Sequence, residues 1–436
     1  MKLPLSFILL TFATSSLAQD FAYPDEETAK SLPGEGPMRD NEGLMKRWPE
    51  LRTQWSKEID ADQSAVVFLG DSITQGWGKE FRDLFPGIKL ANRGIGGDTT
   101  RGMLIRLEED VLSLNPKAIV FLGGTNDIES GIDPEIIGRN FAAIIAAIKK
   151  HNPKVPIILC RTFPSAAERD RPRETIDAVN ALYDATVIGD PQVTVLDTWT
   201  LFADENGDML PADSKDLVHL NPSGYKKWAA ALHPLFATLG LSDTEPDDFT
   251  PEPGFTSLFN GKDLTGWGFR VTPPRKAPKK PNPNRPKFVE ITEPENFDGK
   301  TQSSDGRYQA IGDRLVVTTP AEGRRIQQLW TTEEFDTDFI LKLEFRATPN
   351  ADSGVFIRQP QLQCRDYLLA GPYTELKQYK PQEWNELVVT VKDNIAHATC
   401  NGELLTDNME VPDTGPIGLE GDRGQMEYRR IRLKKS

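Results

Sequence analysis

The first half of the chain alternates short apolar runs with longer amphipathic stretches. Strand-length runs lie at 65–69, 89–92, 118–122, 155–160 and 193–196. Between two of them, residues 134–150 repeat apolar side chains at helical spacing, and a later helix is predicted to begin at Asn221-Pro222, where Asn can cap and Pro suits the first turn. Strands that alternate with helices need crossover connections. This half therefore predicts a three-layer α/β domain with a mostly parallel sheet.

The pattern changes after an acidic, proline-rich stretch at 241–254 (LSDTEPDDFTPEPG), which predicts an interdomain linker. Beyond it, segments rich in β-branched and aromatic residues are separated by turn dipeptides such as Asn401-Gly402, a strong hairpin signal. These segments are 314–319, 339–346, 354–358, 386–392, 395–400 and 426–433. The second half is predicted to be an all-β sandwich of jelly-roll type. A basic, proline-rich insertion at 273–287 is expected to be a solvated loop.

Residues 1–18 are predicted to be a cleavable export signal. Lys2 is the charged start, residues 3–12 are apolar, and Ser16-Leu17-Ala18 is a small-residue cleavage site. No Cys follows that site, and no later apolar run approaches the roughly 18–20 residues of a membrane span. We therefore expect an exported protein, periplasmic or extracellular, without a lipid anchor. Its parts would be a lead-in over 19–45, the α/β domain over 46–240, the linker over 241–254 and the β-sandwich over 255–436.

Composition excludes several classes of function. The 436 residues contain 51 Lys and Arg against 65 Asp and Glu, a formal net charge of −14, whereas nucleic acids and anionic membranes require a basic surface. Three cysteines are too few for a disulfide scaffold, although the spacing leaves open whether Cys364 and Cys400 pair. No His-x-x-x-His motif or Cys/His cluster is present, so we expect neither a metal site nor a cofactor.

Candidate chemistry lies where the predicted parallel strands end, which is where open α/β sheets bind ligands. Three polar blocks follow strands: GDS at 70–72, NRGIGGD at 92–98 and GGTND at 123–127. A fourth, DLVH at 216–219, precedes the last helix. Ser72 is expected at the start of a helix, where free backbone amides and the helix dipole favour a developing negative charge.

A serine nucleophile needs a base that is oriented by a third group, and only four histidines are available. Structural roles are expected for three of them: His151 ends a predicted helix, His233 lies within the last helix, and His397 lies in the alternating pattern of a strand. His219 lies in a loop three residues after Asp216. The pattern predicts a Ser72–His219–Asp216 triad, with a purely local turn role as the alternative for Asp216.

Together, the four ordered blocks resemble the SGNH (GDSL-type) esterase family over about residues 48–239. Within that family they are similar to the catalytic subunits of platelet-activating-factor acetylhydrolase. The resemblance implies a flavodoxin-like α/β fold, the same triad, and an oxyanion hole formed by the backbone amides of Ser72 and Gly97 and the side-chain amide of Asn126. The α/β-hydrolases share the order Ser, Asp, His, but they carry a Gly-x-Ser-x-Gly motif that is missing here. The acids beside these positions are expected to hold the loops through backbone hydrogen bonds: Asp71, Asp98 and Asp127.

The second half also resembles a known family. Its segments 255–267, 352–358 and 415–422 are similar to the 3-keto-disaccharide hydrolase family, whose fold is similar to concanavalin-like lectins and glucanases, and the resemblance spans about 255–434. It implies a carbohydrate ligand. The chain reads Gln361-Leu362-Gln363 where many members carry Glu-x-Gln, and Asp422-Arg423 where many carry His, so plausible general acid and base groups are missing.

Sugar binding is therefore favoured for the second half over catalysis or a purely structural role. Trp330, Gln363 and Tyr367 could contact a sugar, but each fits a core or strand position as well, so the substrate-binding residues are left unassigned. For the whole chain we predict an exported serine esterase that removes short acyl groups, most simply acetyl, from carbohydrate esters. The alternatives are a lipid or thioester substrate, a second active site that hydrolyses 3-keto-glycosides, and a non-catalytic carbohydrate-binding protein.

Overall fold

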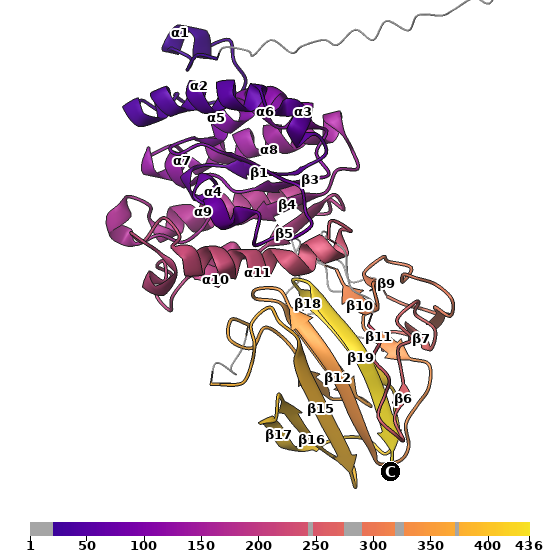
Figure 1. Ribbon diagram of the computed structural model, residues 1–436. Coiled ribbons are helices and arrows are strands. Elements are labelled where there is room, and N and C mark those ends of the chain that lie inside the picture. Colours follow the sequence, from indigo (N-terminus) through magenta and orange to yellow (C-terminus); the bar gives the residue numbers. More distant parts are fainter. Residues whose placement is uncertain (1–20, 243–246, 274–289, 319–326, 371–374) are drawn as a thin grey trace, which may run out of the picture.

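The computed structural model describes residues 21–242, 247–273, 290–318, 327–370 and 375–436. The predicted export signal at 1–18 and nearly all of the proline-rich insertion, from residue 274, lie outside the described residues. The described chain forms an α/β domain followed by a β-sandwich (Figure 1). Within it, no helix is both long and apolar enough to cross a membrane.

A five-stranded parallel sheet forms the centre of the α/β domain, as the alternating pattern predicted. The strands are β1 (Val66–Gly70), β2 (Leu90–Gly94), β3 (Ala118–Phe121), β4 (Ile157–Cys160) and β5 (Val193–Leu196), in the order β2-β1-β3-β4-β5. Every pair runs parallel, so the carboxyl ends of all five strands share one edge. The residues of β1, β3 and β4 are buried throughout, because helices cover both faces of the sheet.

Four long helices make up most of the outer layers, namely α2 (Glu42–Ser56), α8 (Pro134–His151), α9 (Arg173–Val187) and α11 (Pro222–Thr238). Helices α8 and α9 pack on one face through an apolar core that includes Phe141 and Ile176. Helix α11 packs on the other face, where Trp228 stacks on Trp77 at 4.7 Å between ring centroids. Shorter helices lie at α1 (Glu26–Ala29), α3 (Ile59–Asp62), α4 (Ser72–Gln75), α5 (Thr100–Ile105), α6 (Leu107–Asp110), α7 (Thr125–Glu129) and α10 (Thr198–Phe202).

Two antiparallel sheets form the second half. One follows the order β17-β16-β15-β12-β19-β10-β9, with β6 paired to β19, and the other follows β14-β13-β18-β11-β7-β8. The strands of the first are β6 (Thr256–Ser257), β9 (Tyr308–Ile311), β10 (Arg314–Val317), β12 (Phe339–Ala347), β15 (Asn385–Lys392), β16 (Ile395–Cys400), β17 (Glu403–Glu410) and β19 (Met426–Lys435). Those of the second are β7 (Trp267–Phe269), β8 (Glu295–Asn296), β11 (Leu329–Thr331), β13 (Asp352–Ile357), β14 (Gln361–Gln363) and β18 (Ile417–Arg423).

One apolar core lies between these two sheets, which confirms the predicted all-β architecture. Residues along β12 alternate strictly between buried and half-buried, as expected for a strand with one face in a core. Cys364 and Cys400 both lie in this region as free, buried thiols, so the pairing that their spacing allowed is absent. Burial raises the pKa of the Cys400 thiol to about 12, which keeps it protonated and unreactive.

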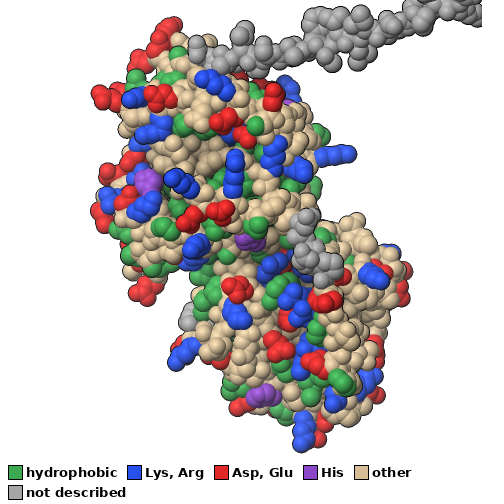
Figure 2. Space-filling model, in the orientation of Figure 1, with side chains coloured by type: hydrophobic (Ala, Val, Ile, Leu, Met, Phe, Trp, Pro, Cys, Tyr) green, Lys and Arg blue, Asp and Glu red, His purple; other side chains and the backbone are tan. Residues whose placement is uncertain are grey.

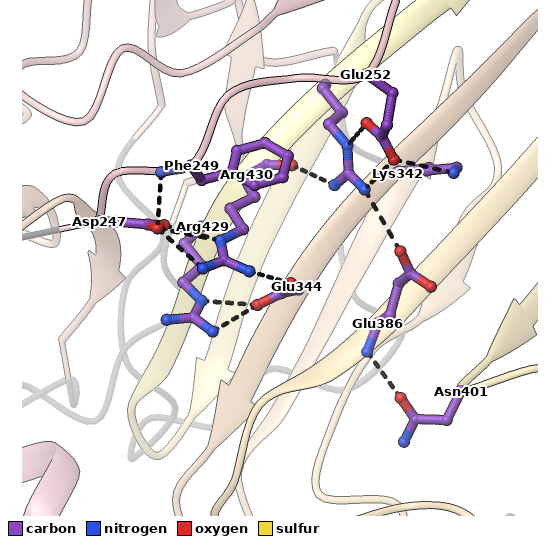
Figure 3. A network of polar contacts seen from close by, with 10 residues as sticks. Asp247, Phe249, Glu252, Lys342, Glu344, Glu386, Asn401, Arg429 and Arg430 are labelled. Atoms are coloured by element: carbon purple, nitrogen blue, oxygen red, sulfur yellow. Dashed lines mark hydrogen bonds and ion pairs between the residues drawn. The ribbon is translucent and has the colours of Figure 1, made fainter. Parts of the chain in front are cut away.

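The described part of the acidic linker is held against the sandwich by two arginines of β19 (Figure 3). Arg430 donates to both carboxylate oxygens of Asp247, and Arg432 donates to both oxygens of Glu252. The ring of Phe249 lies beneath the Arg430 guanidinium at 4.8 Å. The side-chain hydrogen bond from Arg432 holds the pKa of Glu252 at about 2, so this clamp is fully ionised near neutral pH.

The two domains also contact each other directly. Gln425 of the sandwich donates to the Pro234 carbonyl at 3.2 Å and to Thr238 Oγ1 at 3.0 Å, both near the end of α11. Asn350 donates to Asp197 Oδ2 at 2.7 Å, next to the carboxyl end of β5. The face shown in Figure 2 carries charges of both signs interspersed over both domains rather than one basic area.

Candidate active site

Ser72 lies at the carboxyl edge of the parallel sheet, where β1 turns sharply into α4. Asp71 caps this short helix by accepting a hydrogen bond from Ile73 N at 2.9 Å, and Ser72 is its first residue. The turn is tight because the neighbouring strand β2 offers no side chain at Gly94, where a Cβ atom would lie 2.3 Å from Gln75 N. The backbone thus presents a half-buried Ser72 at the end of the sheet.

His219 and Asp216 complete a hydrogen-bonded chain with Ser72. His219 Nε2 lies 2.9 Å from Ser72 Oγ, and His219 Nδ1 lies 2.8 Å from Asp216 Oδ2. A carboxylate only accepts, so Nδ1 carries the proton and donates it to Asp216, which leaves the Nε2 lone pair facing the serine hydroxyl. The structure therefore brings together the three residues predicted as the triad.

A compact turn orients the acid and the base. Asp216 Oδ1 accepts hydrogen bonds from Val218 N at 3.1 Å and from His219 N at 2.8 Å, while Leu217 adopts a left-handed backbone with φ of +66°. Burial acts to raise the pKa of Asp216, but the hydrogen bonds from His219 outweigh it and hold the pKa below its usual range. Asp216 is therefore ionised and also holds the loop, so the turn role that the sequence left as an alternative coexists with the contact to the base.

The three donors predicted for the oxyanion hole follow the carboxyl ends of β1, β2 and β3. Within the described chain, neither Ser72 N nor Gly97 N donates a hydrogen bond to another residue. Gly97 has a φ of +90°, a conformation that glycine adopts without steric cost. Asn126 is buried in α7 and uses one amide hydrogen on the Asp98 carbonyl at 2.8 Å, which leaves its second hydrogen available.

The structure adds a residue that sequence reasoning missed. Arg39, in the lead-in, donates through Nη1 to Asn126 Oδ1 at 2.7 Å and to the Gly97 carbonyl at 3.1 Å. Its Nη2 pairs with Glu129, which also pairs with Arg171 at 3.1 Å. Nothing in the sequence around Arg39 signals this position, because the contact depends on two loops far along the chain.

The three acids beside the site lie buried and hold loops through backbone contacts, as expected. Asp98 accepts from Thr99 N at 3.1 Å, and Asp127 accepts from Thr100 N at 2.9 Å. Burial is the main cause that raises the pKa of Asp71 to about 6 and that of Asp127 to about 7. Oδ2 of Asp71 has no hydrogen-bond partner in the described structure.

The remaining candidates lie away from Ser72. His151 ends α8 on the surface, His233 packs against the ring of Phe85 at 5.2 Å, and His397 is exposed on β16. Trp330 and Gln363 are half-buried, whereas Tyr367 is fully buried in the sandwich core and is therefore closed to a ligand. No group of three or more His, Cys, Asp or Glu side chains in the described residues is arranged to hold a metal ion.

Comparison with known proteins assigns the first domain. The model of the GDSL-like lipase/acylhydrolase family matches residues 68–227. The alpha1 subunit of platelet-activating factor acetylhydrolase IB from Pongo abelii is 31% identical over 221 residues, which are 50% of this chain and 94% of that protein. The chain belongs to the GDSL-like lipase/acylhydrolase family. The alpha2 subunit from Bos taurus is 32% identical over 207 residues, covering 47% of this acylhydrolase and 89% of that subunit.

Residues 254–434 of this GDSL-type acylhydrolase match a second model, the 3-keto-alpha-glucoside-1,2-lyase-like domain. Among solved structures, a GDSL-like lipase from Bacteroides thetaiotaomicron matches with a TM-score of 0.39 and 25% identity, covering 43% of this chain and 97% of that one. By its family model and its acetylhydrolase relatives, the acylhydrolase is an ester-hydrolysing enzyme, and it carries a 3-keto-glycoside hydrolase-like domain at its C-terminal side.

Proposed function

We propose that the acylhydrolase removes short acyl groups, most simply acetyl, from carbohydrate esters, with Ser72 as nucleophile. The observation that carries this proposal is the continuous hydrogen-bonded chain from Ser72 through His219 to Asp216, at 2.9 and 2.8 Å. That arrangement is the one a serine needs in order to become nucleophilic at neutral pH.

In the proposed reaction, Ser72 Oγ attacks the ester carbonyl carbon while His219 Nε2 accepts the hydroxyl proton. The carbonyl oxygen becomes an oxyanion that accepts hydrogen bonds from Ser72 N, Gly97 N and Asn126 Nδ2. Collapse of this intermediate breaks the bond to the alcohol, which leaves with the proton that His219 returns. Water, deprotonated by His219, then attacks the acyl-enzyme, releases the carboxylic acid and restores Ser72.

A short acyl group fits the polar surroundings of the oxyanion donors. Beside Asn126 lie Arg39, Glu129 and Arg171, whose side chains are 15%, 34% and 7% exposed. A long alkyl chain that covered these charged groups would remove them from water at a cost in free energy. The name of the relatives, acetylhydrolase, supports the same choice.

A carbohydrate alcohol is supported by the outer face of the six-stranded sheet. The β-ladder registers put Trp330 and Phe356 on either side of Gly418, with 5.0 Å between the two rings. On the same face, Glu420 accepts hydrogen bonds from Gln328 at 2.7 Å and from Gln361 at 2.6 Å. Aromatic rings beside fixed carboxylate and amide groups are suited to stack on a sugar ring and to bond its hydroxyls.

The deciding experiment measures acetate release from acetylated xylo-oligosaccharides and from p-nitrophenyl acetate, with wild type and Ser72→Ala. If the wild type releases acetate from both substrates and Ser72→Ala releases none, the result would support both the esterase activity and the carbohydrate substrate. Release from the synthetic ester alone, with faster turnover of longer acyl chains, would favour a lipid-like substrate. An inactive wild type across the whole acyl-length panel would favour the non-catalytic binding protein.

Two further parts of the proposal have separate tests. If the Ser72→Ala variant binds insoluble polysaccharide and the Ser72→Ala/Trp330→Ala double variant does not, the outer face of the six-stranded sheet is the sugar-binding surface. Release of a reducing sugar from a 3-keto-glycoside by the Ser72→Ala variant would instead show a second activity.

Export is supported by the pattern of residues 1–18. N-terminal sequencing of the secreted protein is expected to give a mature chain that begins near Gln19. A protein that stays in the cytoplasm and still carries residues 1–18 would contradict export.

A further inference from the structure

We propose that Arg39 is a positioning residue for ester hydrolysis, which holds the two oxyanion donors other than Ser72 at the correct place. The inference rests on the proposed function, because it assigns Gly97 and Asn126 to the oxyanion. Arg39 precedes residues 68–227, which the acylhydrolase family model matches. It belongs to the lead-in over residues 19–45, for which the sequence pattern predicted no function.

A single nitrogen atom joins the two loops. Nη1 of Arg39 has two hydrogens, and it donates one to Asn126 Oδ1 at 2.7 Å and one to the Gly97 carbonyl at 3.1 Å. Gly97 follows β2 and Asn126 follows β3, so no strand pairing fixes these two positions relative to each other. The two loops also meet where Asn126 Nδ2 donates to the Asp98 carbonyl at 2.8 Å, and the guanidinium adds the contact that reaches Gly97 and Asn126 at once.

The far side of the guanidinium is anchored in turn. Nη2 of Arg39 pairs with Glu129, at the end of α7, and Glu129 pairs with Arg171 at 3.1 Å. Arg171 Nε donates to Thr125 Oγ1 at 2.9 Å, one residue before Asn126. Both ends of α7 are thus tied into one charged network, so Asn126 has little freedom to rotate away.

Arg39 also acts electrostatically. Its charge lies behind the Asn126 amide, which accepts a charge-assisted hydrogen bond on Oδ1 and so becomes a stronger donor through Nδ2. The Arg39 side chain is only 15% exposed, and a cation held close to a developing oxyanion lowers the energy of the transition state.

The lead-in is fastened to the α/β domain close to Arg39. Tyr23 Oη donates to the Arg39 carbonyl at 2.9 Å, and the Tyr23 ring packs edge-on against Trp48 of α2 at 5.6 Å. Asn140 of α8 exchanges two hydrogen bonds with the backbone of Glu35, at 2.8 and 3.0 Å. These contacts fix the backbone from which the Arg39 side chain extends.

Steady-state kinetics with p-nitrophenyl acetate test the proposal on the full chain, with wild type, Arg39→Ala, Arg39→Lys and the control Arg139→Ala. Arg139 also contacts the lead-in, through Glu35, but its side chain is 51% exposed. Its substitution by Ala removes the same positive charge as Arg39→Ala. Arg39→Ala is expected to lower kcat by about 10- to 100-fold with KM within about twofold, because an oxyanion donor is misplaced rather than the substrate released. Arg39→Lys should fall between, and Arg139→Ala should match wild type.

Two further readouts separate positioning from a structural role. The inhibition constant of a phenylboronic acid, whose tetrahedral adduct on Ser72 mimics the oxyanion, should rise by the same factor as kcat falls, and methylguanidine should restore part of the activity of Arg39→Ala. If Arg39→Ala does not fold, kcat and the boronate inhibition constant are compared instead between wild type, Arg39→Lys and Glu129→Gln. Unchanged kcat, or a loss of kcat without weaker boronate inhibition, would overturn the inference alone. An inactive wild type would overturn the proposed function instead.

Discussion

The imidazole of His219 and the hydroxyl of Ser72 lie 2.9 Å apart although 147 positions separate the two residues in the chain. Each arrives by a different local device. Ser72 is carried by a turn capped by Asp71, and His219 is carried by a loop that Asp216 and Asn221 close just before α11. Because α4 and α11 pack in the same apolar core, rigid elements fix the contact before any substrate binds.

We expect Asp216→Asn to lower kcat by about 10²- to 10⁴-fold with little change in KM. The amide no longer carries the charge that stabilises the imidazolium formed during attack, and it can favour the wrong tautomer of His219. Steady-state kinetics would measure the effect. Asp213→Asn, three residues earlier and paired with Lys227, is the matched control, and equal activities of the two variants would contradict the assigned role.

Asp71→Asn should change how stability depends on pH. Burial raises the pKa of Asp71 from 3.8 to about 6, so between these values the folded protein retains a proton that the unfolded chain has released. Wild-type stability therefore falls as pH rises through this window, by about 3 kcal/mol at most. The neutral amide still accepts from Ile73 N and avoids that loss.

Thermal unfolding between pH 4 and 8 would show this difference. The stability of Asp71→Asn relative to wild type should increase from about pH 4 and level off above about pH 6. A gap that stays constant over the whole range would mean that Asp71 does not titrate in this window.

The pH dependence of the linker clamp has the opposite sign. The Arg432 hydrogen bond lowers the pKa of Glu252 from 4.5 to about 2, so the clamp contributes its full stability above about pH 4.5 and loses it as pH falls towards 2. The difference in unfolding temperature between wild type and Glu252→Gln should be constant above pH 4.5 and shrink below it. Because Glu252 is 41% exposed, the difference at neutral pH should be small. A gap that widens in acid would refute this assignment.

Glu427→Gln should destabilise the sandwich strongly. The carboxylate is fully buried and accepts from Arg314 Nη1 at 2.5 Å and from Arg346 Nε at 2.6 Å. Without its charge, two arginines on neighbouring strands lose their shared counterion, at a cost of about 3–5 kcal/mol in the free energy of unfolding. Denaturant unfolding would measure it. Glu333→Gln breaks an exposed pair with Lys435 and should cost under about 1 kcal/mol.

Gly94→Ala should reduce activity and stability together. A methyl group there would lie 2.3 Å from Gln75 N and 2.8 Å from the Asp71 carbonyl, both backbone atoms of the turn that carries Ser72. Relief requires the turn to move, which we expect to lower kcat by about 100-fold and to cost about 1–3 kcal/mol. Kinetics and thermal unfolding on the same sample would test this, and wild-type kcat would show that the turn tolerates the contact.

Sequence patterns predicted the parts of the fold whose physical period is strong. Each strand of the parallel sheet is a short apolar run, and the predicted range of each strand agrees with the observed one to within two residues at either end. In the sandwich, β12, β15 and β16 were found where buried and more exposed residues alternate, and β10, β13 and β19 were found because they are rich in β-branched and aromatic residues. The strands β7, β11 and β14 have three residues each, too few to show alternation, and the edge strand β17 has no buried residue and so lacks an apolar face.

The triad was predictable for a different reason. Only four histidines exist, and one of them follows an acid at a spacing that a single turn can close. Arg39 had no such signal, because its acceptors are the Gly97 carbonyl and the Asn126 side chain, and a contact to a backbone carbonyl leaves no trace in residue type. Likewise, no periodicity could show that the acidic linker binds arginines of β19, since that contact depends on tertiary structure.

The position of β19 in its sheet has a consequence for synthesis. This strand comes last among the described strands, yet it lies in the middle, between β12 and β10. While a ribosome is still making the chain, the α/β domain is complete once α11 has emerged, at Thr238, but the large sheet stays divided until residues 426–435 follow. Until then β12 and β10 have unpaired edges, which are sites of aggregation in newly made chains. A protein truncated after Gln425 should therefore accumulate as a folded esterase attached to an unfolded, chaperone-bound tail.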